Sequence, residues 1–191
     1  MLPLEDIIYL HGFNGDGEGW KPAALRRHFP NARVQAPDLP ARPREVNAVI
    51  EGCRTAALTP PLLIGHSLGG FYALYHGARH GLPALLFNPS IEPHRTLAGR
   101  GVGRFKTWTK GRDYDFRESY LEELAAMKVV IDRSVDPRLL RFYLGTEDEI
   151  LDHRPIPALF PEAEITWVPD TGHFFRKFEK VLKQIKKESI T

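Results

Sequence analysis

The chain has 191 residues, of which 42 % are hydrophobic, 26 % charged and 10 % aromatic, and this balance excludes disordered, collagen-like and coiled-coil chains. The formal net charge of +2 is too small for a surface built to bind nucleic acid, and no apolar run approaches the roughly 20 residues of a membrane span. The length predicts a single domain over residues 1–191.

The cysteine content and the first residues bear on the compartment. Cys53 is the single cysteine, so no intrachain disulfide can form. Glu5 and Asp6 stand where a signal peptide would have a basic end followed by an apolar run. We therefore expect a cytoplasmic protein.

Short apolar segments alternate with segments of helical periodicity along the chain. In chain order, the pattern predicts a strand at 7–10, a helix at 20–29, a strand at 32–36, a helix at 43–58, a strand at 61–65, a helix at 68–80, strands at 84–87, 139–144 and 164–168, and a C-terminal helix. The strands lack polar alternation, which is typical of strands covered on both faces. The sequence therefore predicts an α/β fold with a mostly parallel sheet of about six strands and helices on both faces.

Residues 88–136 interrupt this alternation after the fourth strand. The segment is rich in glycine and charge, with one predicted helix at 116–128. We predict that it is a cap insertion within the domain, over the carboxyl ends of the strands, where ligands bind in such sheets. Between residues 95 and 112 it has no acid, and its charge is interpreted either as solvated surface or as a means of steering anionic substrates. The basic residues are Arg95, Arg100, Arg104, Lys106, Lys110 and Arg112.

The segment Gly65-His-Ser-Leu-Gly69 joins a predicted strand directly to a predicted helix. A Gly-x-Ser-x-Gly sequence in this context is typical of a nucleophile elbow, a sharp turn that projects the serine hydroxyl above the sheet. Gly65 and Gly69 leave space where side chains would collide. The pattern predicts Ser67 as a nucleophile, and the alternative is a serine that only caps the following helix.

A serine nucleophile needs a base and an acid that orients the base. In this fold their order is serine, acid, histidine, each in a loop beyond a later strand. Asp148 and His173 fit these positions. Asp170 and Glu147 are the other candidates for the acid.

The remaining histidines fit the role of base less well. His66 adjoins the serine and is expected to point away from its hydroxyl. We expect Asp152 and His153 to cap the next helix. His28, His76 and His80 fall in or at the ends of predicted helices.

The tetrahedral intermediate of acyl transfer needs hydrogen-bond donors for its oxyanion. The Leu68 N–H is one expected donor, because it lies at a helix N-terminus. The Phe13 N–H, in the loop after the first strand, is the second. The glycines of this loop lack the spacing of a nucleotide-binding loop.

Several of these segments together resemble the small α/β-hydrolase family of bacterial YqiA-like serine esterases, over nearly the whole chain. They are His11-Gly-Phe-Asn14, Gly65-His-Ser-Leu-Gly-Gly70, Asn88-Pro-Ser90, Gly145-Thr-Glu-Asp-Glu-Ile-Leu-Asp152 and Gly172-His173. The resemblance implies a compact α/β-hydrolase with Ser67 as nucleophile, Asp148 as acid, His173 as base, and Phe13 and Leu68 as oxyanion donors. The family's Asn-His pair before the last helix is Gly172-His173 here.

The expected activity is hydrolysis of a small-molecule ester or thioester through an acyl-enzyme, with no metal or organic cofactor. Candidate substrate-binding residues are Phe71, Trp108, Phe174 and Phe175. The alternatives are amide or carbon–carbon cleavage on the same fold, and a ligand-binding protein without catalysis. The sequence does not predict the oligomeric state.

Overall fold

The computed structural model describes residues 4–99 and 102–188. Its main sheet has six strands in the order β2-β1-β3-β4-β7-β8, and every neighbouring pair is parallel. The strands are β1 (Asp6–Leu10), β2 (Arg33–Gln35), β3 (Leu62–His66), β4 (Ala84–Phe87), β7 (Leu140–Gly145) and β8 (Glu164–Val168). The predicted parallel sheet of about six strands is confirmed.

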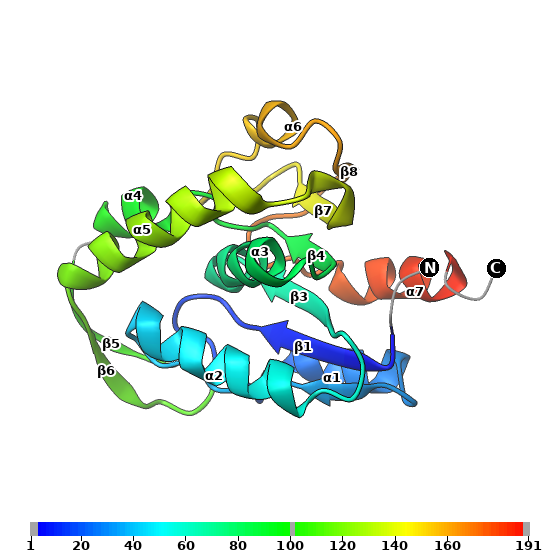
Figure 1. Cartoon of the computed structure of the whole chain (residues 1–191), viewed down its shortest axis with the longest axis horizontal. Coiled ribbons are helices and arrows are strands. Elements are labelled where there is room, and N and C mark those ends of the chain that lie inside the picture. The colour runs from blue at the N-terminus through cyan, green and yellow to red at the C-terminus, as the bar shows by residue number, and fades with distance from the viewer. Residues whose placement is uncertain (1–3, 100–101, 189–191) are drawn as a thin grey trace.

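Helices cover both faces of this sheet (Figure 1). Alternate residues of a strand point to opposite faces, and β1 shows this directly. Ile8 and Leu10 pack in one hydrophobic core with α2 (Pro43–Ala56), α3 (Leu68–His80) and α5 (Ser119–Ser134). Ile7 and Tyr9 pack in a second core with α1 (Trp20–His28) and α7 (Phe178–Glu188). The two cores explain why the central strands β1, β3 and β4 are buried along their whole length, whereas the edge strands β2 and β8 are partly exposed.

The register of the strands brings several loops to one edge of the sheet. Leu10 pairs with Gly65, His66 with Phe87, and Gly145 with Val168. The segments that follow these strand ends contain Phe13, Ser67, Asp148 and His173. The fold therefore gathers the predicted site at the carboxyl ends of the strands.

The segment between β4 and β7 leaves the sheet and returns to the neighbouring position. It contains α4 (Pro93–Ala98), an antiparallel hairpin of β5 (Gly103–Lys106) and β6 (Asp113–Phe116), and α5. The hairpin lies beside the loop that follows β1, to which Trp108 N donates a hydrogen bond at Asn14 O (Figure 1). The predicted helix at 116–128 begins later, at Ser119, and ends later, at Ser134.

Some short elements were not predicted. The strands β5 and β6 are largely exposed, so they lack the apolar run that reveals a buried strand. A 3-10 turn (Pro137–Leu139) and α6 (Ile156–Leu159) are too short to show a helical period. Within the described parts of the chain, no helix combines the length and the apolar character needed to cross a membrane.

Candidate active site

Ser67 lies at a sharp turn between β3 and α3. Its backbone has φ 55° and ψ −122°, a conformation that L-residues rarely adopt and that costs about 1–3 kcal/mol. Neighbouring backbone groups hold it there, since Ser67 N donates to Phe87 O at 3.1 Å and Ser67 O accepts from Ser90 N at 3.0 Å. The turn thus has the backbone geometry of a nucleophile elbow.

The two glycines of the elbow are required by close backbone contacts. A Cβ atom at Gly65 would lie 2.4 Å from the carbonyl oxygen of Gly69. A Cβ atom at Gly69 would lie 2.0 Å from the carbonyl oxygen of Leu10. Both distances are far inside van der Waals contact, so any side chain at either position would displace the turn.

The structure brings Ser67, His173 and Asp148 into one chain of hydrogen bonds. His173 Nε2 lies 3.0 Å from Ser67 Oγ, and His173 Nδ1 lies 2.9 Å from Asp148 Oδ2. Because a carboxylate only accepts, Nδ1 carries the proton of the neutral imidazole. The lone pair on Nε2 then faces the serine hydroxyl, which is the arrangement a general base requires.

Asp148 is held as a buried carboxylate, with its side chain only 2 % exposed. It also accepts hydrogen bonds from the backbone N–H groups of Ile150 and Leu151, each at 2.9 Å. Burial alone would raise the pKa of Asp148, but hydrogen bonds from His153 and His173 outweigh it and hold the pKa well below its ordinary value. The other two candidate acids are exposed: Asp170 pairs with Lys177, and the backbone N–H of Glu147 bonds to Thr171 O.

His153 also belongs to this arrangement, a role that the sequence did not predict. Its Nε2 donates to Asp148 Oδ2 at 2.8 Å, and its side chain is 3 % exposed. The prediction that Asp152 and His153 cap the next helix was wrong, because α6 has no side-chain cap and Asp152 pairs with Arg154 instead. The one signal in the sequence was the separation of only five residues between Asp148 and His153, which lets a single turn bring the two side chains together.

Three successive carbonyl groups of the histidine loop are fixed by side chains from other elements. Asn88 Nδ2 donates to Gly172 O at 3.0 Å, and His66 Nε2 donates to His173 O at 2.8 Å. His66 thus points at the histidine backbone. Burial, with the charge of Lys21, keeps the pKa of His66 well below its ordinary value, so its ring is neutral.

Lys21 completes this set from α1. Its Nζ donates to Phe174 O at 2.8 Å and lies 4.7 Å and 4.6 Å from the ring centroids of Trp20 and Phe174. Burial lowers the pKa of Lys21 to about 7. Periodicity identified α1 as a helix but gave no sign that this lysine faces inward.

The proposed oxyanion donors lie next to the elbow. A Cβ atom at Gly12 would be 3.0 Å from Ser67 Cβ, so the backbone leading to Phe13 passes directly beside the nucleophile. Leu68 is the first residue of α3, where backbone N–H groups have no partner within the helix. Both residues line a cavity of about 90 Å³ together with Ser67 and His173.

A second cavity of about 140 Å³ opens at Ser67 and His173. Trp108 and Phe174, two of the four predicted substrate-binding residues, line it and are 66 % and 45 % exposed. The structure contradicts the other two. Phe71 and Phe175 are fully buried, because Phe71 lies on the core side of α3 and Phe175 turns inward against Phe87.

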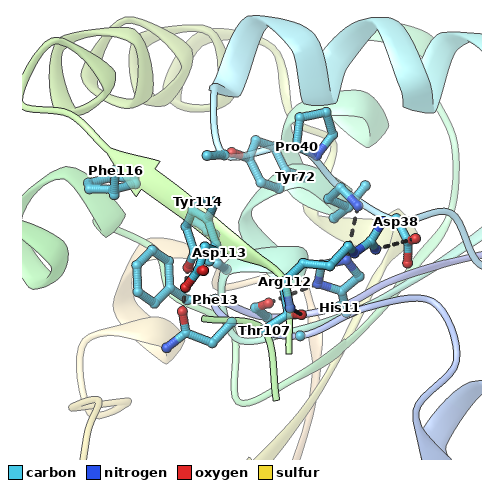
Figure 2. A pocket seen from close by; sticks show the side chains of 16 residues that line it. His11, Phe13, Asp38, Pro40, Tyr72, Thr107, Arg112, Asp113, Tyr114 and Phe116 are labelled. Carbon is cyan, nitrogen blue, oxygen red and sulfur yellow. Dashed lines mark hydrogen bonds and ion pairs between the residues drawn. The ribbon is translucent and has the colours of Figure 1, made fainter. Parts of the chain in front are cut away.

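A larger cavity of about 370 Å³ lies between the loop after β1 and the hairpin (Figure 2). Phe13 forms its border with the active site, and its ring packs edge-to-face on Phe116 at a centroid distance of 5.4 Å. Figure 2 also shows Arg112 paired with Asp38 at the other side of this cavity. The hairpin thus supports the residue proposed as an oxyanion donor.

The described basic residues between positions 95 and 112 are paired with acids. Lys110 and Arg112 both donate hydrogen bonds to Asp38, which accepts another from Gly17 N. These hydrogen bonds outweigh the desolvation of the Asp38 carboxylate, so its pKa lies well below the ordinary value. Arg104 and Lys106 both contact Asp113, and Arg95 contacts Glu92. Arg100 lies outside the described residues. These pairs favour the interpretation of the segment as surface over that of a steering device.

The sheet order, the elbow and the loop positions define the α/β-hydrolase fold. A ferulic-acid-bound Est1E from Butyrivibrio proteoclasticus superimposes with a TM-score of 0.73 and 17 % identity, covering 97 % of this chain and 88 % of that one. A monoacylglycerol lipase from Paleococcus ferrophilus gives a TM-score of 0.73 and 14 % identity, covering 98 % and 95 %.

The chain belongs to the uncharacterised protein family UPF0227, whose model matches residues 6–188. A UPF0227 protein of Vibrio campbellii is 28 % identical over 190 residues, covering 94 % of this chain and 97 % of the relative. The UPF0227 protein YcfP of Salmonella paratyphi A is 27 % identical over 190 residues, covering 94 % and 96 %. The family resemblance of the sequence motifs is thereby confirmed.

Proposed function

We propose that this protein is a serine hydrolase that cleaves carboxylic esters or acyl thioesters of small acyl groups. The observation that carries the proposal is the continuous hydrogen-bonded chain from Ser67 through His173 to the buried Asp148. A protein that only bound a ligand would not need an activated serine, an imidazole in the matching tautomer and an anionic acid in one line.

The mechanism follows from the positions of these groups. His173 Nε2 takes the hydroxyl proton as Ser67 Oγ attacks the substrate carbonyl, and Asp148 stabilises the imidazolium that forms. The N–H groups of Phe13 and Leu68 donate to the oxyanion. The alcohol or thiol leaves with the proton from His173, and water then repeats the sequence to release the acid.

The size of the cavity at Ser67 supports a small acyl group. Its volume is about 140 Å³, and Trp108 and Phe174 offer aromatic surface at its rim. Esterases and lipases occur among proteins of the same fold, including one whose structure holds ferulic acid, and this agrees with an ester as substrate.

Covalent labelling tests the proposal without knowledge of the natural substrate. A fluorophosphonate probe should give one adduct per chain, mapped to Ser67 by peptide mass spectrometry, because an activated serine reacts rapidly. Ser67→Ala should abolish the adduct. Ser90→Ala is the matched control, since Ser90 lies beside the elbow and should label as wild type. Absence of labelling, or an adduct at Ser90, would contradict the proposal that Ser67 is the nucleophile of a hydrolase.

Activity assays on the same protein separate ester or thioester cleavage from amide cleavage. Turnover of p-nitrophenyl acetate and of a matched acyl thioester is expected in the same preparation. Labelling of Ser67 with turnover of an anilide but not of either ester would assign amide cleavage instead.

A further inference from the structure

A cluster of side chains of the types that bind metals lies between α2 and α3, two helices that pack in the same core on one face of the sheet. His76 and His80 are one helical turn apart on α3, and Glu51 faces them from α2. One ligand atom from each residue lies within 4.8 Å of the others. The proposed hydrolytic mechanism uses none of these residues.

His76 carries an unpaired nitrogen that points into this cluster. Its side chain is 1 % exposed, and its Nε2–H donates to Asn47 Oδ1 at 3.2 Å. In the neutral ring, Nδ1 therefore has a lone pair, and it has no hydrogen-bond partner. It lies 3.2 Å from Glu51 Oε1, so two acceptors face each other, one on a buried ring and one on a carboxylate that is 32 % exposed.

A cation between these two atoms would satisfy both. Tetrahedral zinc with ligand distances near 2.0–2.2 Å separates its ligands by roughly 3.3 Å, close to the spacing of His76 Nδ1 and Glu51 Oε1. His80 Nε2 donates a hydrogen bond to the same carboxylate oxygen at 2.5 Å, which the ion would replace, and Arg54 Nε donates to the other oxygen at 2.8 Å. The hydrogen bond from His76 to Asn47 fixes the ring orientation, as a metal-bound histidine requires.

We propose that Glu51, His76 and His80 form a site for a divalent transition metal of the zinc class, with water as the fourth ligand. Solvent can reach the open position, because the side chains of Glu51 and His80 are 32 % and 22 % exposed. His76 lies nine residues along the chain from Ser67, roughly 13 Å by helical rise. At this distance the ion links α2 to α3 and takes no part in the reaction.

Titration of the full chain tests the site. Protein treated with a chelator and then dialysed should bind one Zn²⁺ per chain by calorimetry, and Co²⁺ should give the visible absorption of a tetrahedral complex. At a free Zn²⁺ concentration 100 times the dissociation constant, the Tm should rise by roughly 5–10 °C. The absence of saturable binding would mean that the cluster is only an ion-pair network.

Variants decide which residues hold the ion. Glu51→Gln and His80→Gln should each weaken Zn²⁺ binding by at least about tenfold, the usual effect of losing a ligand or its support. His28→Gln removes another histidine–carboxylate contact, to Glu179, and should bind as wild type. Cys53→Ser should also bind as wild type. Binding that survives both ligand substitutions, or that requires Cys53, would overturn the proposal.

Discussion

At the scale of single residues, the proposed acid is the most discriminating test of the active site. Asp148→Asn should lower kcat by about 10⁴, because the amide favours the wrong tautomer of His173. Asp170→Asn and Glu147→Gln, at exposed positions, should leave kcat within a few-fold of wild type. Thermal unfolding of each variant controls for loss of the fold. A large effect at Asp170 with none at Asp148 would reassign the acid.

His153 is expected to act as a positioning residue through Asp148. His153→Phe removes the hydrogen bond to the carboxylate while it keeps a ring in the buried site. A hydrogen bond to a charged group is worth about 1.5–3 kcal/mol, so kcat should fall by roughly 10-fold to 100-fold with little change in KM. His153→Gln, which retains a donor, should recover part of the loss. An unchanged kcat in the phenylalanine variant, with lowered Tm, would mean that His153 only stabilises the loop.

The lowered pKa of Lys21 predicts how the stability of the protein changes with pH. Its pKa is lowered from 10.5 to about 7, so between these values the unfolded chain binds more protons than the folded one. The stability of wild type relative to Lys21→Met should therefore rise as the pH increases from 7 to 10.5. Urea unfolding at several pH values measures it. A constant difference over this range would show that the folded protein keeps Lys21 charged throughout.

The residues of the site were predictable to different degrees. Ser67 was predictable because the elbow needs two glycines at fixed spacing, and Asp148 and His173 because parallel strands place successive loops together. Asn88, His66 and Lys21 were not, because each acts on a carbonyl group of a loop that is distant in sequence. Single residues of a helix or strand end give no sequence signal for such contacts.

At the scale of elements, the strand–turn–helix unit around Ser67 depends on backbone proximity. Gly69→Ala should destabilise the protein and abolish labelling by the fluorophosphonate, because its Cβ would lie 2.0 Å from a carbonyl oxygen. Gly52→Ala is the matched control in α2, where a Cβ meets nothing within 4 Å. That variant should be more stable than wild type by about 0.5–1 kcal/mol, through helix propensity. Equal Tm changes in the two variants would contradict the close packing of the elbow.

The elements of the insertion show where periodicity fails. The buried strands and long helices of the main fold lie within a few residues of their predicted positions, because burial on both faces produces long apolar signals. The β5–β6 hairpin has four residues in each strand and one exposed side, so its sequence resembles a loop. Its position over Phe13 depends on aromatic contacts that only the folded chain reveals.

At the scale of the whole molecule, the distribution of charge is more even in space than in sequence. The basic segment at 95–112 contains no acid, yet its described members contact acids from other segments or from its own flanks. Such pairs cancel much of the field that separate cations would produce at a distance. The sequence pattern could not show this, because Asp38 and Glu18 are far away along the chain.

This pairing predicts how the proposed hydrolase responds to salt. Exposed charges are screened beyond about 8–10 Å at physiological ionic strength, so steering would give an anionic ester an advantage at low salt that high salt removes. We expect instead that kcat/KM for an anionic ester and for a neutral ester of the same acyl chain change in parallel between low and high salt. Arg104→Ala, at the hairpin, should behave as Arg138→Ala, which breaks a similar exposed pair with Asp136 in a different segment. A salt-sensitive preference for the anionic ester that Arg104→Ala reduces and Arg138→Ala does not would restore steering by the insertion.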